Sequence, residues 1–340
     1  MLLEINEASS LPKYKQLIQS IKESIESGRI KYGQKLPSIN QLSFDYYLSR
    51  DTVEKAYKEL KKKGFIESVK GKGYYVTNSA PESKFNVLVI FNKISAYKKV
   101  IYNSIAHNLG DKAQIDFFIY HNDYETFERF IQERLEGYHY YVIMPHFMDY
   151  NRKSLFELLS QINQEKLIFL DTIVEDIKNY KGAVYQDFKM DIFETLGKAN
   201  DLLKKYKKLV LVFPDNEIYT YPKEIELGFR KFCGFNNYEY QIIDGIIEIT
   251  KIEANTAYIV IEENDLVNLI KIIRSKKMKL AEEIGILSYN DTVLKEVLAE
   301  GISVISTDFY EMGEHAANII LGKESGIIKN NFEFIQRNSL

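Results

Sequence analysis

Cysteine occurs only once in this sequence of 340 residues, at Cys233, so no intramolecular disulfide can form. This scarcity fits a reducing compartment, and we expect a cytoplasmic protein. No stretch of about 18 apolar residues is present, which predicts that the chain has no transmembrane helix. No apolar run follows a basic beginning, so we also expect no secretory signal.

Motifs of several chemistries are missing as well. The five histidines are scattered without the spacing of a metal site, and no zinc pattern occurs. Neither a Walker loop nor a Gly-x-Gly-x-x-Gly sequence is present, which leaves nucleotide chemistry without support. We therefore predict no bound metal ion, no cofactor and no enzymatic activity.

The net charge of −3 conceals an uneven distribution. Residues 1–80 hold 14 Lys and Arg against 9 Asp and Glu, whereas the remainder holds 31 against 39. A basic beginning on an acidic body indicates that one end meets a polyanion. The length of 340 residues predicts two or three domains, and the 45% hydrophobic content allows sizeable cores.

Residues 36–76 predict two helices followed by a hairpin. Ser38 can cap the first helix, with Gln41 completing a capping box, and Ser49 can cap the second. The first helix would pack through Leu42, Phe44, Tyr46 and Tyr47, and the second through Val53, Ala56, Tyr57 and Leu60. The opposite face of the second helix is basic and carries Arg50, Lys55, Lys58, Lys61 and Lys62.

Two short strands follow the C′ glycine Gly64 and turn at residues 71–73. The turn is rich in lysine, so it would reach phosphate or a minor groove. A small helical domain with a solvated charged face is the alternative. The order of these parts favours a winged helix-turn-helix that binds double-stranded DNA.

The N-terminal segment, roughly residues 9–77, resembles the GntR regulator family. The resemblance is carried by residues 11–16, by Gly28, Gly33 and residues 36–38, by Ser49-Arg50-x-Thr52-Val53, and by Gly71-Lys72-Gly73-Tyr74. It implies that Arg50 reads a guanine, that neighbouring hydroxyls hold phosphates, and that the glycine turn enters the minor groove. The DNA-binding residues would be Ser38, Asn40, Ser49, Arg50, Thr52, Lys55, Lys70, Gly71, Lys72 and Gly73. Relatives often have Arg at positions 40 and 54, where this chain has Asn40 and Glu54, so the operator sequence cannot be copied from them.

After a polar linker at 79–84, strands alternate with helices. Expected strands are 86–91, 114–120, 140–144, 167–170, 209–213, 257–261, 284–287 and 304–306, and expected helices are 97–108, 124–136, 154–163, 190–204, 223–233, 265–275, 293–299 and 310–321. Almost wholly apolar strands with helical crossovers predict parallel sheets covered on both faces. We expect an α/β fold of two Rossmann-like lobes that part near residue 185. The domains would be 1–78, a linker at 79–84, and 85–340.

The ends of these strands are polar, and ligands of open parallel sheets bind at the carboxyl ends of the strands. These ends read Asn92-Lys93, Pro145-His146, Asp171, Asp187, Asp215-Asn216, Glu262-Glu263-Asn264-Asp265, Asn290-Asp291 and Asp308. The alternative is that Asp and Asn merely begin turns and cap helices. Eight such ends favour a ligand cleft.

Residues 84–340 resemble the effector domain of lac-repressor and ribose-binding-like proteins, the periplasmic-binding-protein type 1 fold. The resemblance is carried by residues 167–171, Gly228-Phe229, residues 257–260 with Asn264-Asp265, residues 283–292, residues 301–305, and residues 310–316. It implies sugar contacts at Asp171, Asp187, Asp265 and Asn290. Relatives often have Asp at position 290 and Arg at position 225, where this chain has Ile, so Lys223, Glu224 or Glu226 would set the sugar orientation instead.

Carboxylates and amides pair with sugar hydroxyls, and aromatic rings cover the apolar sugar faces. Phe147, Tyr219, Tyr221 and Phe309 are available for that. The predicted effector site comprises Asn92, Lys93, His146, Phe147, Asp171, Asp187, Tyr219, Lys223, Glu224, Asp265, Asn290 and Asp308.

These features predict a dimeric transcriptional regulator, a repressor released by a small ligand, with a monosaccharide as the expected effector. An alternative is a DNA-binding protein whose second part does not bind sugar or is enzyme-derived, such as an aminotransferase-like body, although 260 residues is short for one. A purely architectural DNA binder is a further alternative.

Overall fold

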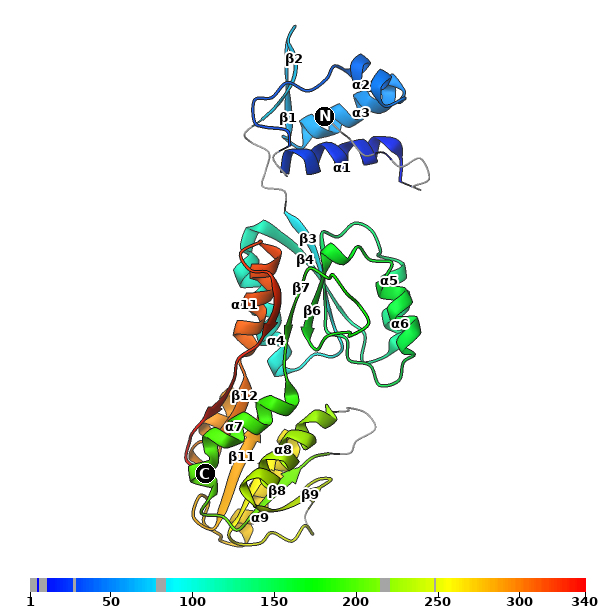
Figure 1. The fold of residues 1–340 in the computed structure, drawn as a ribbon. Helices are drawn as coiled ribbons and strands as arrows, with labels where there is room; N and C mark the ends of the chain where they lie inside the picture. The colour runs from blue at the N-terminus through cyan, green and yellow to red at the C-terminus, as the bar shows by residue number, and fades with distance from the viewer. Residues whose placement is uncertain (1–4, 6–10, 27–28, 78–83, 215–220, 248) are drawn as a thin grey trace. The chain divides into compact units, whose positions relative to one another are not determined.

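The computed structural model describes residues 5, 11–26, 29–77, 84–214, 221–247 and 249–340. The chain divides into two compact units, residues 1–85 and 86–340 (Figure 1). Gly28 and positions 79–83 of the expected linker lie outside the described residues.

The first unit is a winged helix-turn-helix. Its elements are α1 (Lys13–Glu26), α2 (Ile39–Asp45), α3 (Arg50–Lys62), β1 (Ile66–Val69) and β2 (Gly73–Val76). The two strands pair antiparallel, with Val69 opposite Gly73 at the turn. Val53, Ala56, Tyr57 and Leu60 are all buried, so the predicted inner face of α3 is confirmed.

Two details of the expected helix packing are wrong. Phe44 is 79% exposed and Tyr47 is 92% exposed, so neither packs into the core. Tyr47 lies in the turn after α2 and has a φ of 50°, so it does not continue the helix whose inner face holds Leu42. The capping box is also incomplete: Ser38 Oγ accepts from the Gln41 backbone N–H, but the Gln41 side chain donates to Asp45 Oδ1 (2.8 Å) instead of returning to residue 38.

The second unit begins with an N-lobe built on a six-stranded sheet. The strand order is β13-β7-β6-β5-β3-β4, and β13, β7, β6, β5 and β3 run parallel. The strands are β3 (Phe85–Phe91), β4 (Ala113–Ile119), β5 (Tyr140–Ile143), β6 (Leu167–Asp171), β7 (Gly182–Tyr185) and β13 (Gly326–Lys329). Helices α4 (Ala96–Leu109) and α11 (Phe309–Ile320) pack together on one face, and α5 (Tyr124–Gln132) and α6 (Arg152–Leu159) lie on the other (Figure 1).

The C-lobe has the same plan. Its sheet order is β14-β12-β11-β10-β8-β9, with β14 antiparallel to β12 and the other described pairs parallel. The strands are β8 (Lys208–Val212), β9 (Glu239–Ile243), β10 (Thr256–Val260), β11 (Ile284–Tyr289), β12 (Ser303–Thr307) and β14 (Phe332–Ile335). The helices are α7 (Phe188–Leu203), α8 (Lys223–Asn236), α9 (Glu263–Ser275) and α10 (Val293–Val297).

The expected fold class is therefore confirmed, and all eight expected strands of the second unit are present. The chain passes between the lobes three times, at β7–α7, at β12–α11 and at β13–β14. Only the first passage, near residue 185, was expected from the sequence.

Two glycines allow helices to approach closely. A Cβ at Gly228 of α8 would collide with the backbone of Lys189 in α7, and one at Gly313 of α11 would collide with the backbone of Ile101 in α4. Helix backbones this close require glycine at the contact. Both glycines belong to the stretches that carry the family resemblance, and the packing supplies their physical reason.

Candidate DNA interface and ligand cavity

The start of α3 presents Arg50 to solvent. Ser49 Oγ accepts from the Thr52 backbone N–H (3.2 Å) and lies 2.7 Å from Thr52 Oγ1, so both hydroxyls are organised by the cap. Arg50, the first residue of the helix, is exposed and makes no hydrogen bond or ion pair with any described residue. Its guanidinium is consequently available for a planar partner such as a guanine edge.

The lysines of α3 are more engaged. Lys58 pairs with Glu54 (2.8 Å), and Lys61 donates to Ser68 Oγ (2.8 Å). Lys55 is exposed, and its Nζ lies 4.1 Å from the centre of the Tyr14 ring of α1. Ser38 and Asn40, at the start of α2, are both exposed.

The hairpin turn is the wing. Gly71 and Gly73 have φ of 76° and 110°, which only glycine adopts readily. Lys72 donates its backbone N–H to Val69 O (3.0 Å), and the side chains of Lys70 and Lys72 are exposed on either side of Gly71. The turn thus presents two ammonium groups on a tight backbone.

The second unit encloses a cavity of about 1030 Å³ between its lobes. That volume is at the upper end of the range for small-molecule sites, about 300–1,000 Å³. The carboxyl ends of strands from both sheets reach it, as the strand-end argument predicted: β3, β5, β6 and β7 of the N-lobe, and β10 and β11 of the C-lobe.

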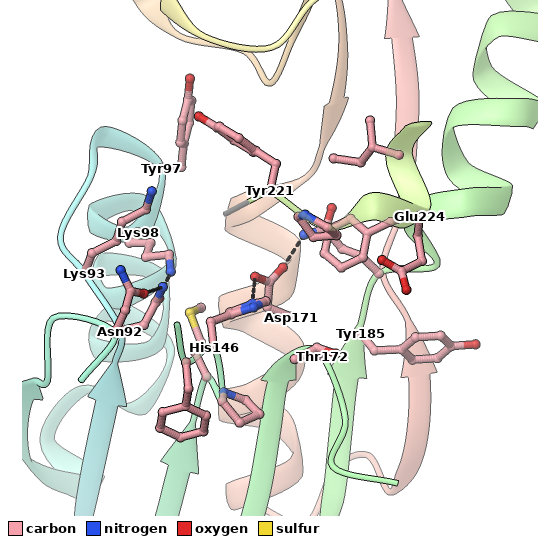
Figure 2. Close-up of a pocket in the computed structure, with 18 of the residues that line it drawn as sticks. Asn92, Lys93, Tyr97, Lys98, His146, Asp171, Thr172, Tyr185, Tyr221 and Glu224 are labelled. Atoms are coloured by element: carbon pink, nitrogen blue, oxygen red, sulfur yellow. Dashed lines mark hydrogen bonds and ion pairs between the residues drawn. The ribbon is translucent and has the colours of Figure 1, made fainter. Parts of the chain in front are cut away.

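Asp171 is the centre of the N-lobe lining (Figure 2). Its Oδ2 lies 2.6 Å from His146 Nε2, and its Oδ1 accepts a hydrogen bond from Gln186. Burial acts to raise the pKa of Asp171, but the hydrogen bond and charge of His146, the charge of Lys98 and the Gln186 bond outweigh it and lower that pKa to about 2. Asp171 is therefore a carboxylate at neutral pH.

A second polar group surrounds Asn92. Its Nδ2 donates to Asn122 Oδ1 (2.6 Å), and its Oδ1 accepts from Lys98 Nζ. Burial lowers the pKa of Lys98 to about 8, against the opposing attraction of Asp171. Burial also lowers the pKa of Lys93, which lies beside it in Figure 2.

The C-lobe lining is acidic. It includes Glu224 in the first turn of α8, with Glu262 and Glu263 at the start of α9. Burial raises the pKa of Glu262, and the nearby charge of Asp265 adds to the rise. Asn290 follows β11 with φ of 60°, and its backbone carbonyl accepts from the buried Lys295 (2.7 Å).

The structure brings eight of the predicted effector residues to the cavity and leaves three elsewhere. The eight are Asn92, Lys93, His146, Phe147, Asp171, Asp187, Glu224 and Asn290. Tyr219, with Asp215 and Asn216, lies outside the described residues. Which of the lining residues contact a ligand stays a prediction.

Lys223, Asp265 and Asp308 do not line the cavity. Lys223 is exposed at the start of α8. Asp265 turns away and accepts the Ile246 backbone N–H at Oδ1 (2.7 Å), and Asp308 caps α11 by accepting from the Glu311 N–H (2.8 Å). Asp187 also caps its helix, accepting from the Met190 N–H (3.1 Å), yet it remains in the lining.

Aromatic rings cover part of the cavity. Tyr97 stacks on Phe309 with ring centres 5.0 Å apart, and Tyr221 lies 5.8 Å from Lys93 Nζ. Phe147 packs against Tyr120 at 5.1 Å, within the N-lobe core cluster. The sequence analysis did not predict Tyr97, Lys98 or Gln186 in the lining. Tyr97 and Lys98 lie in the first turn of α4, whereas Gln186 directly follows the short strand β7, which was not expected.

The part of the chain that the structure describes contains no helix long and apolar enough to cross a membrane. Within the same residues, no cluster of three or more His, Cys, Asp or Glu side chains is arranged to hold a metal ion.

Residues 13–76 match the family model for bacterial regulatory proteins of the gntR family. The HTH-type transcriptional repressor YtrA of Bacillus subtilis (strain 168) is 42% identical over 79 residues; this match covers 23% of the present chain and 61% of YtrA, less than two thirds of its length. The arabinose metabolism transcriptional repressor of Geobacillus stearothermophilus is 22% identical over 351 residues, covering 92% of this chain and 91% of that protein.

Solved structures with a similar fold were found for the second unit. The LacI family transcriptional regulator CCPA from Weissella paramesenteroides, with bound sucrose, superposes with a TM-score of 0.60 at 16% identity, covering 75% of this chain and 98% of that one. This likeness shows the fold, and the alternative of an aminotransferase-like body is wrong. Residues 13–76 thus match the gntR family of bacterial regulatory proteins, and the fold of the second unit is similar to the two-lobed fold of solved LacI-family regulators.

Proposed function

We propose that this chain is a cytoplasmic transcriptional repressor whose affinity for operator DNA is set by a monosaccharide bound between the two lobes. The observation that carries this proposal is the cavity itself, in which polar strand ends of both lobes face one space. The two relatives described above are named as transcriptional repressors, which supports the direction of control.

The cavity chemistry supports a polyhydroxylated ligand. Asp171 can accept from ligand hydroxyls, and Lys98 has ammonium protons beyond the one that Asn92 accepts. Tyr97, Tyr221 and Phe309 offer ring faces to the C–H faces of a pyranose or furanose. A ligand that forms hydrogen bonds with both lobes at once stabilises the closed arrangement, in which the lobes lie closest together. Hinge closure of this kind is a known means of conformational switching.

Control of DNA then follows from geometry. Two heads on a homodimer must match two operator half-sites, which are spaced by whole turns of the double helix. Lobe closure in each subunit would alter the separation of the heads. The dimer belongs to the proposal, and sedimentation velocity of the full-length chain tests it.

The test of the regulator has two steps. Selection from a random duplex library with the full-length chain identifies a tight-binding DNA, and mobility shifts are then measured with each common aldopentose and aldohexose. We expect one sugar to weaken DNA binding by at least about tenfold, a free-energy difference of about 1.4 kcal/mol. Failure of every sugar to bind the chain by calorimetry would refute sugar control and leave only the DNA-binding assignment.

A further inference from the structure

The lining of the cavity carries an excess of negative charge. Among the described residues, seven carboxylates line it against three cations, Lys93, Lys98 and Arg152, and one histidine, His146, which is paired with Asp171. The carboxylates are Asp171, Glu175, Asp176, Asp187, Glu224, Glu262 and Glu263. All three cations come from the N-lobe, so the described C-lobe side of the cavity holds carboxylates without a lysine or arginine.

The two lysines already have carboxylate neighbours. Asp171 raises the pKa of Lys98 against the larger lowering by burial, and Glu262 and Asp171 do the same for Lys93. Lys98 also donates to Asn92. Figure 2 shows Lys93 and Lys98 on one side of the cavity, Glu224 on the other, and Asp171 between them. Carboxylates of the protein therefore already lie near both ammonium groups, so neither needs an anionic ligand to balance its charge.

Two buried side-chain atoms of the lining have no hydrogen-bond partner, and both are acceptors. Gln186 Oε1 and Asn290 Oδ1 are both buried and have no hydrogen-bond partner. Gln186 is only 9% exposed, and its Nε2 is held by Asp171, which fixes the amide. A buried acceptor is satisfied by a ligand hydroxyl or ammonium group, whereas an ionised phosphate or carboxylate oxygen has no proton to donate.

From this charge balance and these two unpaired oxygens, we propose that the cavity selects an uncharged or amino-substituted sugar and excludes phosphorylated and carboxylated sugars. The inference rests on the proposed function and narrows it to a chemical class. A phosphate group would approach Glu224, Glu262 or Glu263 from any position on the C-lobe side. Repulsion between like charges in a partly buried site amounts to about tenfold to a hundredfold in affinity, on the order of the Coulomb interaction at protein-like dielectric.

The test compares matched ligands on the full-length chain. Calorimetry is run with ribose, arabinose, glucose and the other common aldoses, each beside its terminal phosphate ester, and with glucosamine and gluconate. We expect at least one neutral or amino sugar to bind, and its phosphate ester to bind at least about tenfold more weakly. A phosphate ester or gluconate that binds as tightly as its neutral parent overturns the inference but leaves sugar control standing. Absence of binding by every compound overturns the proposed function, and the inference with it.

Charge variants locate the cause. Glu224→Gln and Glu262→Gln keep the shape of the side chain. Each should reduce the ratio of the affinities for the parent sugar and for its phosphate ester by at least about threefold. Added salt should reduce this affinity ratio in the wild type, because it screens the repulsion between the phosphate group and the carboxylates of the cavity. Glu239→Gln on β9, an exposed carboxylate that does not line the cavity, is the matched control and should leave the affinity ratio unchanged. An unchanged affinity ratio in both cavity variants would show that charge does not select the ligand.

Discussion

Asp171 combines several features of a functional residue. It ends β6, its φ of 72° lies in the left-handed region that non-glycine residues seldom adopt, and its carboxylate is held on both oxygens. Asn290, at the end of β11 in the other lobe, has a φ of 60°. Strained backbone of this kind costs about 1–3 kcal/mol and persists where the surroundings enforce it. One such residue on each lobe aims a polar side chain at the same cavity.

Replacing Asp171 by Asn should weaken sugar binding by about tenfold to a hundredfold, because a buried hydrogen-bonding group then has no partner. Operator affinity without sugar should not change. Asp149→Asn, which changes an exposed aspartate of the N-lobe outside the lining, is the control. Calorimetry and mobility shifts on both variants check this. Wild-type sugar affinity in Asp171→Asn would remove Asp171 from the ligand site.

The same substitution makes a prediction for pH. The pKa of Asp171 is lowered from 3.8 to about 2, so its ionised form stabilises the folded chain above about pH 4. That contribution, about 2 kcal/mol, is lost as pH falls from about 4 to about 2. The free energy of unfolding of the wild type, measured with urea, should therefore exceed that of Asp171→Asn by more at pH 5 than at pH 3. A difference that stays constant down to pH 3 would contradict the lowered pKa.

Arg50→Ala should reduce affinity for the selected operator by at least about tenfold, since a bidentate guanine contact contributes about 1–3 kcal/mol. The residue is exposed at the start of α3, so the melting temperature should not change. Arg274→Ala, an exposed arginine on α9, is the matched control. Undiminished operator affinity in a mobility-shift titration would show that Arg50 does not read a base.

Single residues also show where sequence reasoning stops. Asp265 and Asn290 follow adjacent strands and share the same polar character, and both were predicted to contact the ligand. Asn290 lines the cavity, but Asp265 is bonded to the backbone of Ile246. Residue type and position after a strand predicted the end of the sheet near which each residue lies. Its direction depends on a loop at residues 244–247 that lies distant in sequence, and no local pattern encodes that contact.

At the scale of elements, strongly patterned segments were predictable, whereas three of the four strands that end a sheet, β9, β13 and β14, were not; the fourth, β4, was expected. Central strands such as β6 and β10 are mostly apolar and buried along nearly their whole length, because both faces are covered. Strands β9 and β13 end their sheets and are largely exposed, so their sequences lack that continuous apolar run. Strand β7 is only four residues long. The wing, in contrast, follows from two glycines whose positive φ leaves few alternatives.

Lys72→Ala in that wing should weaken binding to selected and unrelated DNA alike, because an interaction with phosphate carries no sequence information. The slope of log affinity against log salt should fall by roughly one unit for each phosphate that the variant no longer neutralises. Lys198→Ala, an exposed lysine of α7, should leave the slope unchanged. If Lys72→Ala weakens only the selected site at an unchanged slope, Lys72 reads bases and the wing has a different role.

At the scale of the second unit, three chain passages join the lobes, and Asn330 ties them together. Its backbone N–H donates to Tyr185 O (2.8 Å) of the first passage. Its side-chain amide donates to Thr307 Oγ1 (3.0 Å) and to Asp308 O (2.8 Å) of the second. The residue is 2% exposed. Gln186, the next residue of the first passage, donates to Asp171, so the bonds of Asn330 are linked to the ligand cavity through the Tyr185-Gln186 backbone.

Asn330→Ala should therefore disturb the coupling between sugar and DNA more than either binding event. Loss of the amide costs about 1–3 kcal/mol of stability, because Thr307 and Asp308 lose a buried donor. The fold-change in operator affinity caused by saturating sugar should shrink by at least about threefold, while operator affinity without sugar is retained. Asn338→Ala removes a comparable bond, to Glu300 O (2.6 Å), at an exposed place in the C-lobe away from the three passages. It should lower the melting temperature without changing the coupling, since additive effects are expected of sites that share no partners. Equal coupling in the wild type and both variants would show that Asn330 only holds the passages together and that lobe movement is controlled elsewhere.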